Sequence, residues 1–196
     1  MREIVKLVVV LGLICGLSAA ALTFARQSLA KKIETQSDLY VRGPALQRLF
    51  DRPADQLLQN KITFNSGGGS YTIFYLTEGN EITALAVEAP GPGGYSGDVL
   101  IMIGLDLTTN KMLNIEIIQH SETPGVGSRI EKATFRKQWS GLSADTPVRM
   151  GQGGQIDAIS GATYSSRAVV AGTNVIADLI QNHRDDILEA IKAHQS

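Results

Sequence analysis

Residues 156–180 read IDAISGATYSSRAVVAGTNVIADLI, and this stretch decides how the C-terminal part of the chain folds. Its first four residues, 156–159, are mostly apolar and predict a short strand. After Gly161 the apolar residues recur every three or four positions, which predicts a helix with one buried face. That face consists of Ala168, Val169, Ala171, Gly172, Val175, Ile176, Leu179 and Ile180. Because the first N–H groups of a helix lack helical partners, this junction can hold an anion such as a phosphate.

The hydroxyl side chains at this junction allow two interpretations. Ser160, Thr163 and Ser165 can simply cap the helix, as serine and threonine commonly do. Alternatively, Gly161 lets the backbone approach a bulky ligand, and the hydroxyls lie beside it. The residues alone favour the cap.

Upstream of the junction, β-branched and aromatic residues alternate with polar ones in several short runs. Turn residues separate these runs, which predicts an antiparallel sheet with each strand beside the next. The expected strands are residues 61–65, 71–77, 81–89, 98–108 and 112–119, with turns at 67–69, 78–80 and 109–110. Short helices are expected at 45–50 and 129–139. The fold class is therefore α+β, a mainly antiparallel sheet packed with helices.

The N-terminal segment predicts a membrane anchor. Residues 7–25 contain no charge, and as a helix they span roughly 28 Å, close to the thickness of a bilayer core. A cleaved signal peptide is the main alternative, and a buried core helix is another; the length of the apolar run favours a retained anchor. Basic residues flank both ends, so charge does not fix the orientation. We expect a single-pass protein of the cytoplasmic (inner) membrane, with its domain on the periplasmic side.

These patterns divide the chain into four parts. Residues 1–26 form the cytoplasmic start and the anchor, 27–59 a stalk with short helices, 60–182 the folded domain, and 183–196 a polar C-terminal helix.

Composition excludes several functions. Eighteen basic and 19 acidic residues give a net charge of -1, so the basic surface of a nucleic-acid-binding protein is absent. Cys15 is the single cysteine and lies in the apolar run, which excludes an internal disulfide, a cysteine zinc site and an iron–sulfur cluster held by this chain alone. The three histidines are scattered, so no metal site is expected. Redox chemistry would need an organic cofactor or a partner.

The string DAISGATYSS at 157–166 resembles the flavinylation motif of the FMN-binding domain family, and every motif position agrees. The resemblance implies that a flavin transferase joins the phosphate of FMN to Thr163, with Ser160, Gly161 and Ala162 beside it. Two more segments are similar to that family, 94–106 beginning GYSG and 120–127 reading HSETPGVG, where Val126 stands at a position more often leucine. They imply further flavin contacts at Tyr95, Ser96, Glu122, Thr123, Pro124 and Gly125.

Each of these contacts also has a simpler explanation. Thr123-Pro124-Gly125 is a turn sequence whatever its function. Glu122 is by default a solvated carboxylate, Tyr95 can pack in the core instead of stacking on the flavin ring, and Trp139 is expected to be a core anchor. Basic residues on 129–137 can be an ordinary helix face, or a cation near a reduced flavin.

Within the family, the layout most resembles the G subunit of Rnf-type complexes, the ion-translocating ferredoxin:NAD oxidoreductases. The C subunit of the sodium-translocating NADH:quinone reductase is similar but typically longer. This resemblance implies an electron-transfer subunit with no catalytic residue of its own. Its partners would be other membrane subunits, which carry iron–sulfur clusters or flavins, and membrane lipid. A noncovalent phosphate-ligand binding module and a purely structural subunit remain the alternatives.

Overall fold

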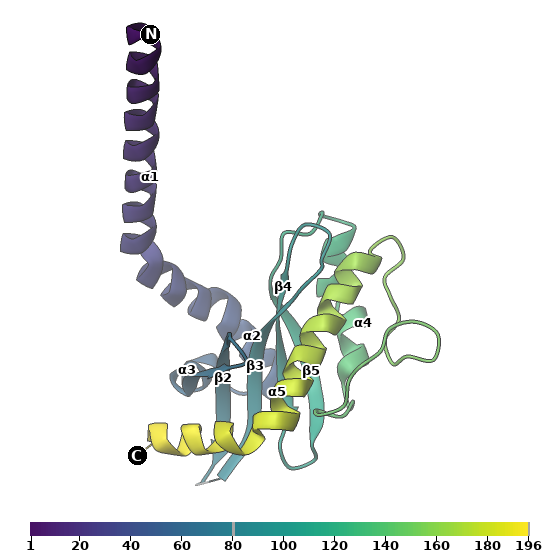
Figure 1. Cartoon of the computed structure of the whole chain (residues 1–196). Helices are drawn as coiled ribbons and strands as arrows, with labels where there is room; N and C mark the ends of the chain where they lie inside the picture. The colour runs from purple at the N-terminus through teal and green to yellow at the C-terminus, as the bar shows by residue number, and fades with distance from the viewer. Residues whose placement is uncertain (80, 196) are drawn as a thin grey trace. The chain divides into compact units, whose positions relative to one another are not determined.

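The computed structural model describes residues 1–79 and 81–195, and it divides into two units, Met1–Tyr40 and Val41–Ser196. The first unit is essentially one helix, α1 (Arg2–Ser37) (Figure 1). None of the residues of α1 is buried. The helical segment Arg2–Phe50 contains an 18-residue window with a mean hydropathy of 2.5, so it is long and apolar enough to cross a membrane. The helix continues past residue 26, into the expected stalk.

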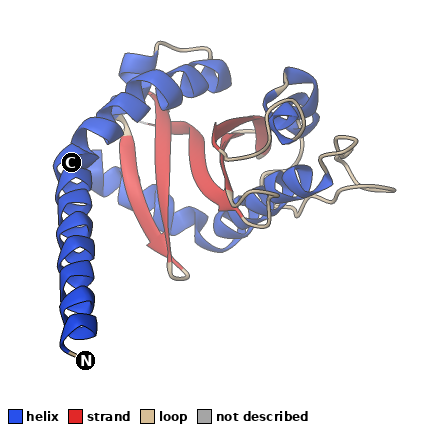
Figure 2. Cartoon of the chain, turned by 90° about the horizontal axis from the view of Figure 1, so that it is seen from above, coloured by secondary structure: helices blue, strands red, loops and turns tan. Residues whose placement is uncertain are grey.

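The second unit is built on five antiparallel strands, each paired with its neighbour in the chain. They are β1 (Lys61–Ser66), β2 (Gly69–Glu78), β3 (Glu81–Gly91), β4 (Val99–Asp106) and β5 (Lys111–Gln119). Figure 2 shows these strands in red, with helices on both sides. The antiparallel sheet expected from the alternating sequence is confirmed, with strand ends within two residues of the expected ones. In the expected turn at 78–80, the third residue lies outside the described residues.

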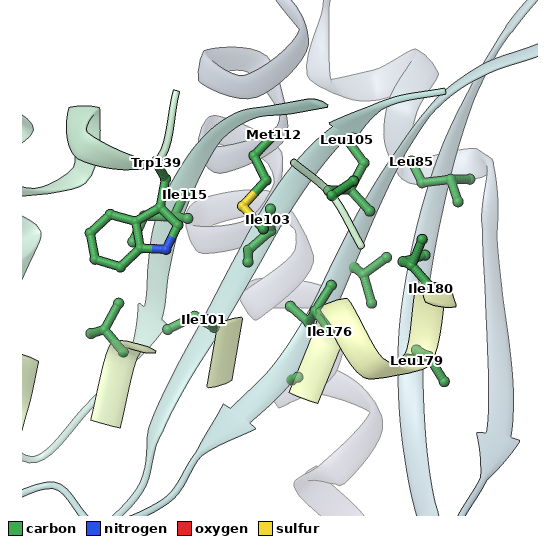
Figure 3. Packing of buried hydrophobic residues seen from close by; sticks show 14 of the residues in the cluster. Leu85, Ile101, Ile103, Leu105, Met112, Ile115, Trp139, Ile176, Leu179 and Ile180 are labelled. Atoms are coloured by element: carbon green, nitrogen blue, oxygen red, sulfur yellow. The ribbon is translucent and has the colours of Figure 1, made fainter. Parts of the chain in front are cut away.

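Helices cover both faces of this sheet. After a π-helical turn, η1 (Asp38–Arg42), the helices α2 (Gly43–Phe50) and α3 (Ala54–Gln59) pack on one face. The long helix α5 (Thr163–Gln195) packs on β3 and β4 from the other face. Successive residues of β4 therefore enter different cores: Ile101 and Ile103 face α5, whereas Met102 belongs to the cluster under α2. Figure 3 shows the larger core, where Ile176 and Ile180 of α5 meet the side chains of the sheet.

Two buried glutamates attach neighbouring helices to the sheet. Glu88 of β3 is 4% exposed and pairs with Arg42, which follows the anchor, at 2.6 Å. Glu116 of β5 is 3% exposed and pairs with Arg48 of α2 and with Arg136. Each of these two carboxylates thus has at least one guanidinium partner, which offsets the cost of removing its charge from water.

Two expectations about the segment between β5 and α5 were wrong. The helix expected at 129–139 is divided into a 3₁₀ turn, η2 (Gly127–Glu131), one α-helical turn, α4 (Ala133–Arg136), and a second 3₁₀ turn, η3 (Lys137–Trp139). Lys132 adopts an extended conformation and interrupts the helix. The strand expected at 156–159 is a single bridge between Ile156 and Met150. Ile156 is fully buried, so its apolar character reflects core packing and not strand pairing.

The helix α5 bends where its sequence becomes polar. His183 has non-helical backbone angles, φ -134 and ψ 19, and its Nε2 lies 2.8 Å from the Ser66 hydroxyl. Beyond the bend, Ile187 and Ile191 are buried against the same core. The polar C-terminal stretch is therefore a helix that belongs to the compact unit.

Candidate functional site

A hollow of about 320 Å³ lies beside the N-terminus of α5. Three segments that are distant in the sequence form it: the loop after β3, the loop after β5, and the first turn of α5 with the residues before it. Its lining residues are Tyr95, Glu122, Thr123, Val126, Gly127, Gly161, Ala162, Thr163, Tyr164 and Ser165.

Thr163 is the first residue of α5, and it is exposed at this hollow. The Ala162 carbonyl accepts a hydrogen bond from the Ser166 N–H at 3.0 Å, so the helical pattern begins there. The preceding residue, Gly161, has a φ of +80, a conformation that favours glycine. The N–H groups of the first helical turn, with the positive end of the helix dipole, are thus directed at the space beside the Thr163 hydroxyl.

Buried side chains fix the segment that leads to Thr163. The fully buried Ser166 hydroxyl accepts the Ile159 N–H at 3.0 Å and donates to the Ala162 carbonyl at 3.0 Å. The Gln138 amide oxygen accepts the Asp157 N–H at 2.7 Å. The position of Thr163 is therefore set by hydrogen bonds to the loop before the helix, not by helix capping alone.

Glu122 lies at the floor of the hollow and is 4% exposed. Its Oε2 accepts a hydrogen bond from the Ser165 hydroxyl at 2.6 Å, and its Oε1 accepts the Ser96 N–H at 3.2 Å. The Glu122 N–H donates to Nδ1 of His120 at 3.0 Å, and Nε2 of His120 faces Glu131 at 3.0 Å. The default expectation of a solvated carboxylate at this position was wrong, because the side chain joins all three segments of the site.

Two glycines make room for this carboxylate. A Cβ on Gly94 would lie 2.5 Å from Oε1 of Glu122, and a Cβ on Gly127 would lie 2.6 Å from its Oε2. Both distances are too short for any side chain, so these positions require glycine while Glu122 keeps its place.

Exposed aromatic and aliphatic side chains surround the opening of the hollow. Tyr95 is 73% exposed, Tyr164 is 59% exposed and Val126 is 45% exposed. The suggestion that Tyr95 packs in the core was therefore wrong. The Arg167 guanidinium lies 5.6 Å from the centre of the Tyr164 ring, a distance at which it adds a cation–π contact. An apolar rim next to a helix N-terminus suits a ligand that has both a planar ring system and a phosphate.

The structure brings together most of the residues that the sequence singled out. Tyr95, Glu122, Thr123, Gly161, Ala162 and Thr163 line the hollow, and the backbone of Ser96 binds Glu122. Ser160, Pro124 and Gly125 are not among the lining residues. The Ser160 carbonyl accepts from Arg129 at 3.1 Å. Gly125 has a φ of +75 and donates to the Ser128 hydroxyl at 2.9 Å, so the turn interpretation of this stretch is confirmed.

Sequence reasoning missed part of the lining and identified one core residue correctly. Four residues line the hollow but were not singled out as contacts: Val126, Gly127, Tyr164 and Ser165. Ser165 was considered only as a possible cap, because residues two apart on a helix do not face the same way and its spacing from Thr163 gave no signal of a shared site. Trp139 is fully buried and donates its ring N–H to the Thr173 hydroxyl at 2.8 Å, so its role as a core anchor is confirmed.

Comparison with known proteins supports an FMN-binding role for the domain that contains this hollow. Residues 94–178, which contain all three segments of the hollow, match the FMN-binding domain family. The G subunit of the ion-translocating oxidoreductase complex of Stutzerimonas stutzeri is 32% identical over 83% of this chain and 74% of the relative. The protein of the same name from Shewanella piezotolerans is 28% identical over 96% of this chain and 95% of the relative. The chain belongs to this family of G subunits, as its motifs indicated. The FMN-binding domain and the membership in this family identify the protein as a flavoprotein subunit of a larger complex. The apolar helix α1 serves as its membrane anchor.

The fold is shared with a second group of proteins. The structure of the C subunit of the Na⁺-translocating NADH-quinone reductase from Parabacteroides distasonis superimposes with a TM-score of 0.59 at 17% identity, over 78% of this chain and 94% of that chain.

Proposed function

We propose that this protein is an electron-transfer subunit of an Rnf-type ion-translocating oxidoreductase complex and carries FMN esterified to Thr163. The observation that carries the proposal is the position of Thr163. Its side chain is exposed at a hollow that combines an apolar rim with the N-terminus of a long helix. Membership in the family of G subunits supplies the kind of complex.

The residues of the hollow have separate parts in this proposal. A phosphate ester on Thr163 would lie beside the N–H groups of the first turn of α5, where a negative charge is stabilised. Tyr95, Tyr164 and Val126 would cover part of the ring system and limit its contact with water. The flavin supplies the electron chemistry when it is bound, so no side chain of the chain needs to act as an acid or a base.

A covalent bond has a physical reason if the domain lies outside the cytoplasm. A ligand held with nanomolar affinity, roughly 12 kcal/mol, and binding at about 10⁶ M⁻¹ s⁻¹ would dissociate within about ten minutes. Where free FMN is scarce, the lost flavin would not be replaced. An ester to Thr163 removes this loss, and this reasoning supports an anchor in the cytoplasmic membrane with the domain on its periplasmic side.

Other proteins would carry out flavin attachment, electron exchange and ion movement. A flavin transferase would attach FMN during maturation, and partner proteins with iron–sulfur clusters or flavins would exchange electrons with it. One membrane helix cannot enclose an ion path, so ion movement would take place in partner proteins within the lipid bilayer.

A Thr163→Val variant tests the attachment site. Full-length protein made together with a flavin transferase is separated on a denaturing gel, where only covalently bound flavin remains and fluoresces. We expect the wild type to fluoresce, and its tryptic peptide containing Thr163 to gain the mass of FMN less one water. Thr163→Val should be dark, whereas Thr123→Val, a second threonine at the same hollow, should fluoresce like the wild type. Fluorescence retained by Thr163→Val would refute the assignment.

Two alternatives follow from specific observations. The shared fold makes the C subunit of a sodium-translocating NADH:quinone reductase the second candidate, and identification of co-purifying proteins distinguishes it from an Rnf-type complex. The helix N-terminus would also suit a noncovalent phosphate ligand. In that case the native protein would be coloured and the denaturing gel dark.

A further inference from the structure

We infer that Glu122 lowers the reduction potential of the flavin at this site by placing a buried, uncompensated negative charge at the floor of the hollow. This inference rests on the proposed function. It concerns the charge of Glu122, whereas the proposed function concerns the attachment of the flavin to Thr163.

The first observation is the set of groups that hold the carboxylate. Both oxygens accept hydrogen bonds, Oε2 from the Ser165 hydroxyl at 2.6 Å and Oε1 from the Ser96 N–H at 3.2 Å. Both donors are neutral. They fix the carboxylate in position, but they carry no positive charge that would cancel a charge on it.

The second observation is the contrast with the other two buried glutamates. Glu88 is paired with Arg42, and Glu116 with Arg48 and Arg136. Among the described residues, no lysine or arginine forms an ion pair with Glu122. The guanidinium of Arg129 donates to the Ser160 carbonyl instead. A buried carboxylate without a cation is costly to stability, so its presence at the hollow beside Thr163 calls for a functional reason.

The third observation is that the surrounding backbone is adapted to this side chain. Gly94 and Gly127 come from different loops, and each would place a Cβ within 2.6 Å of a Glu122 oxygen. The carboxylate therefore lies in a close-fitting setting that admits no nearby side chain at either position. Such a setting holds the charge at a fixed place relative to Thr163, because Ser165 lies in the same helical turn.

A fixed negative charge opposes the addition of an electron nearby. For two unit charges about 10 Å apart at an effective dielectric constant of about 20, Coulomb's law changes the reduction equilibrium by roughly tenfold per electron. A tenfold change per electron corresponds to about 59 mV. Removing the charge should therefore raise the midpoint potential by about this amount.

The experiment compares two variants that each remove one carboxylate charge. Glu122→Gln keeps the size of the side chain and one oxygen acceptor, and it removes the buried charge. The control is Glu131→Gln on the neighbouring 3₁₀ turn, whose carboxylate is 60% exposed and screened by water. Full-length flavin-loaded proteins in detergent are titrated with dithionite, which donates the electrons, and the flavin absorbance gives the midpoint potential.

We expect Glu122→Gln to raise the potential by about 59 mV and Glu131→Gln to change it far less. An unchanged or lowered potential in Glu122→Gln would overturn the inference, as would an equal rise in the control. If Glu122→Gln does not fold, Ser165→Ala removes one donor and leaves the carboxylate less screened, so its potential should be lower than that of the wild type; an unchanged or raised potential would contradict the inference.

Gel fluorescence of the wild type tests the covalent attachment to Thr163 independently of the role of Glu122. A wild type with bound flavin that is lost under denaturing conditions would refute the covalent attachment, while its potential would still test the role of Glu122. A flavin that stays attached, together with equal potentials in all variants, would refute the role of Glu122 alone.

Discussion

The buried pair of Trp139 and Thr173 provides a sharp test of how α5 is held on the domain. Both side chains are fully buried. The Trp139 ring N–H donates to the Thr173 hydroxyl at 2.8 Å, and this hydroxyl donates in turn to the Val169 carbonyl at 3.0 Å. A Thr173→Val variant keeps the shape of the side chain but leaves the Trp139 N–H without an acceptor.

The expected cost follows from that unpaired donor. A buried N–H group without a partner destabilises a protein by about 1–3 kcal/mol, and valine and threonine have similar helix propensities. We therefore expect Thr173→Val to lower the free energy of unfolding by about 2 kcal/mol. For a domain of this size, each kcal/mol lowers the melting temperature by about 2–4 °C, so the expected decrease is roughly 4–8 °C.

A double-mutant cycle separates the hydrogen bond from the change in volume. Trp139→Phe removes the donor and part of a ring that contacts Phe135 edge to face at 5.1 Å. In the double variant no donor is left unpaired, so its loss should be smaller than the sum of the single losses by about 1–2 kcal/mol. Thermal unfolding of the full-length protein in detergent, followed by far-UV circular dichroism, measures all four proteins. Thr134→Val, at an exposed threonine, is the control. Additive losses would refute the reasoning.

Two further predictions concern close packing and acid stability. Gly91→Ala should destabilise the domain by about 3 kcal/mol, because its Cβ would lie 2.1 Å from the backbone carbonyl oxygen of Ala168. A Cβ on Gly172 would lie 2.9 Å from Cδ1 of Ile101 and 3.0 Å from the Cα of Gly91, a smaller overlap, so Gly172→Ala should cost about 1–2 kcal/mol. Equal melting temperatures would contradict this difference. The side-chain hydrogen bond from Thr109, followed by backbone N–H groups of the same turn, lowers the pKa of Asp106 below 3.8. The ionised Asp106 carboxylate therefore stabilises the fold fully above pH 3.8, and this stabilisation is lost as the pH falls through the lowered pKa. The Asp106→Asn variant should consequently lose less stability on acidification than the wild type. If the melting temperatures of the two proteins fall in parallel, Asp106 does not contribute to the acid sensitivity.

The sheet was predictable because its signal is local. Strands β1 to β5 alternate between two faces, and glycines mark the turn after β1, so period and turn residues place the strands within two residues. The segment between β5 and α5 was not predictable in this way. Its apolar residues, such as Ile156 and Trp139, are set by tertiary packing and follow neither a helical nor a strand period.

Site residues were predictable where a local sequence pattern fixes their place in the fold. They were not predictable where their role depends on burial by residues that are distant in the sequence. Thr163 follows from a helix start and from a motif. Glu122 could not be recognised as buried, because a carboxylate next to a turn is normally solvated. Its burial depends on Ser165 and on two glycines from other segments, which only the folded chain brings together.

The order of the strands has a consequence for biogenesis. Since β1 to β5 pair in chain order, a growing polypeptide can assemble the whole sheet before α5 has been synthesised. Until then one apolar side of the sheet, including Ile101 and Ile103, has no cover, and such a species is prone to aggregate. Thr163, the proposed attachment site, is synthesised with this last helix. If FMN is attached at Thr163 as proposed, an enzyme that recognises the assembled hollow would modify only chains that have completed folding, and the presence of the flavin would then distinguish folded from unfolded chains.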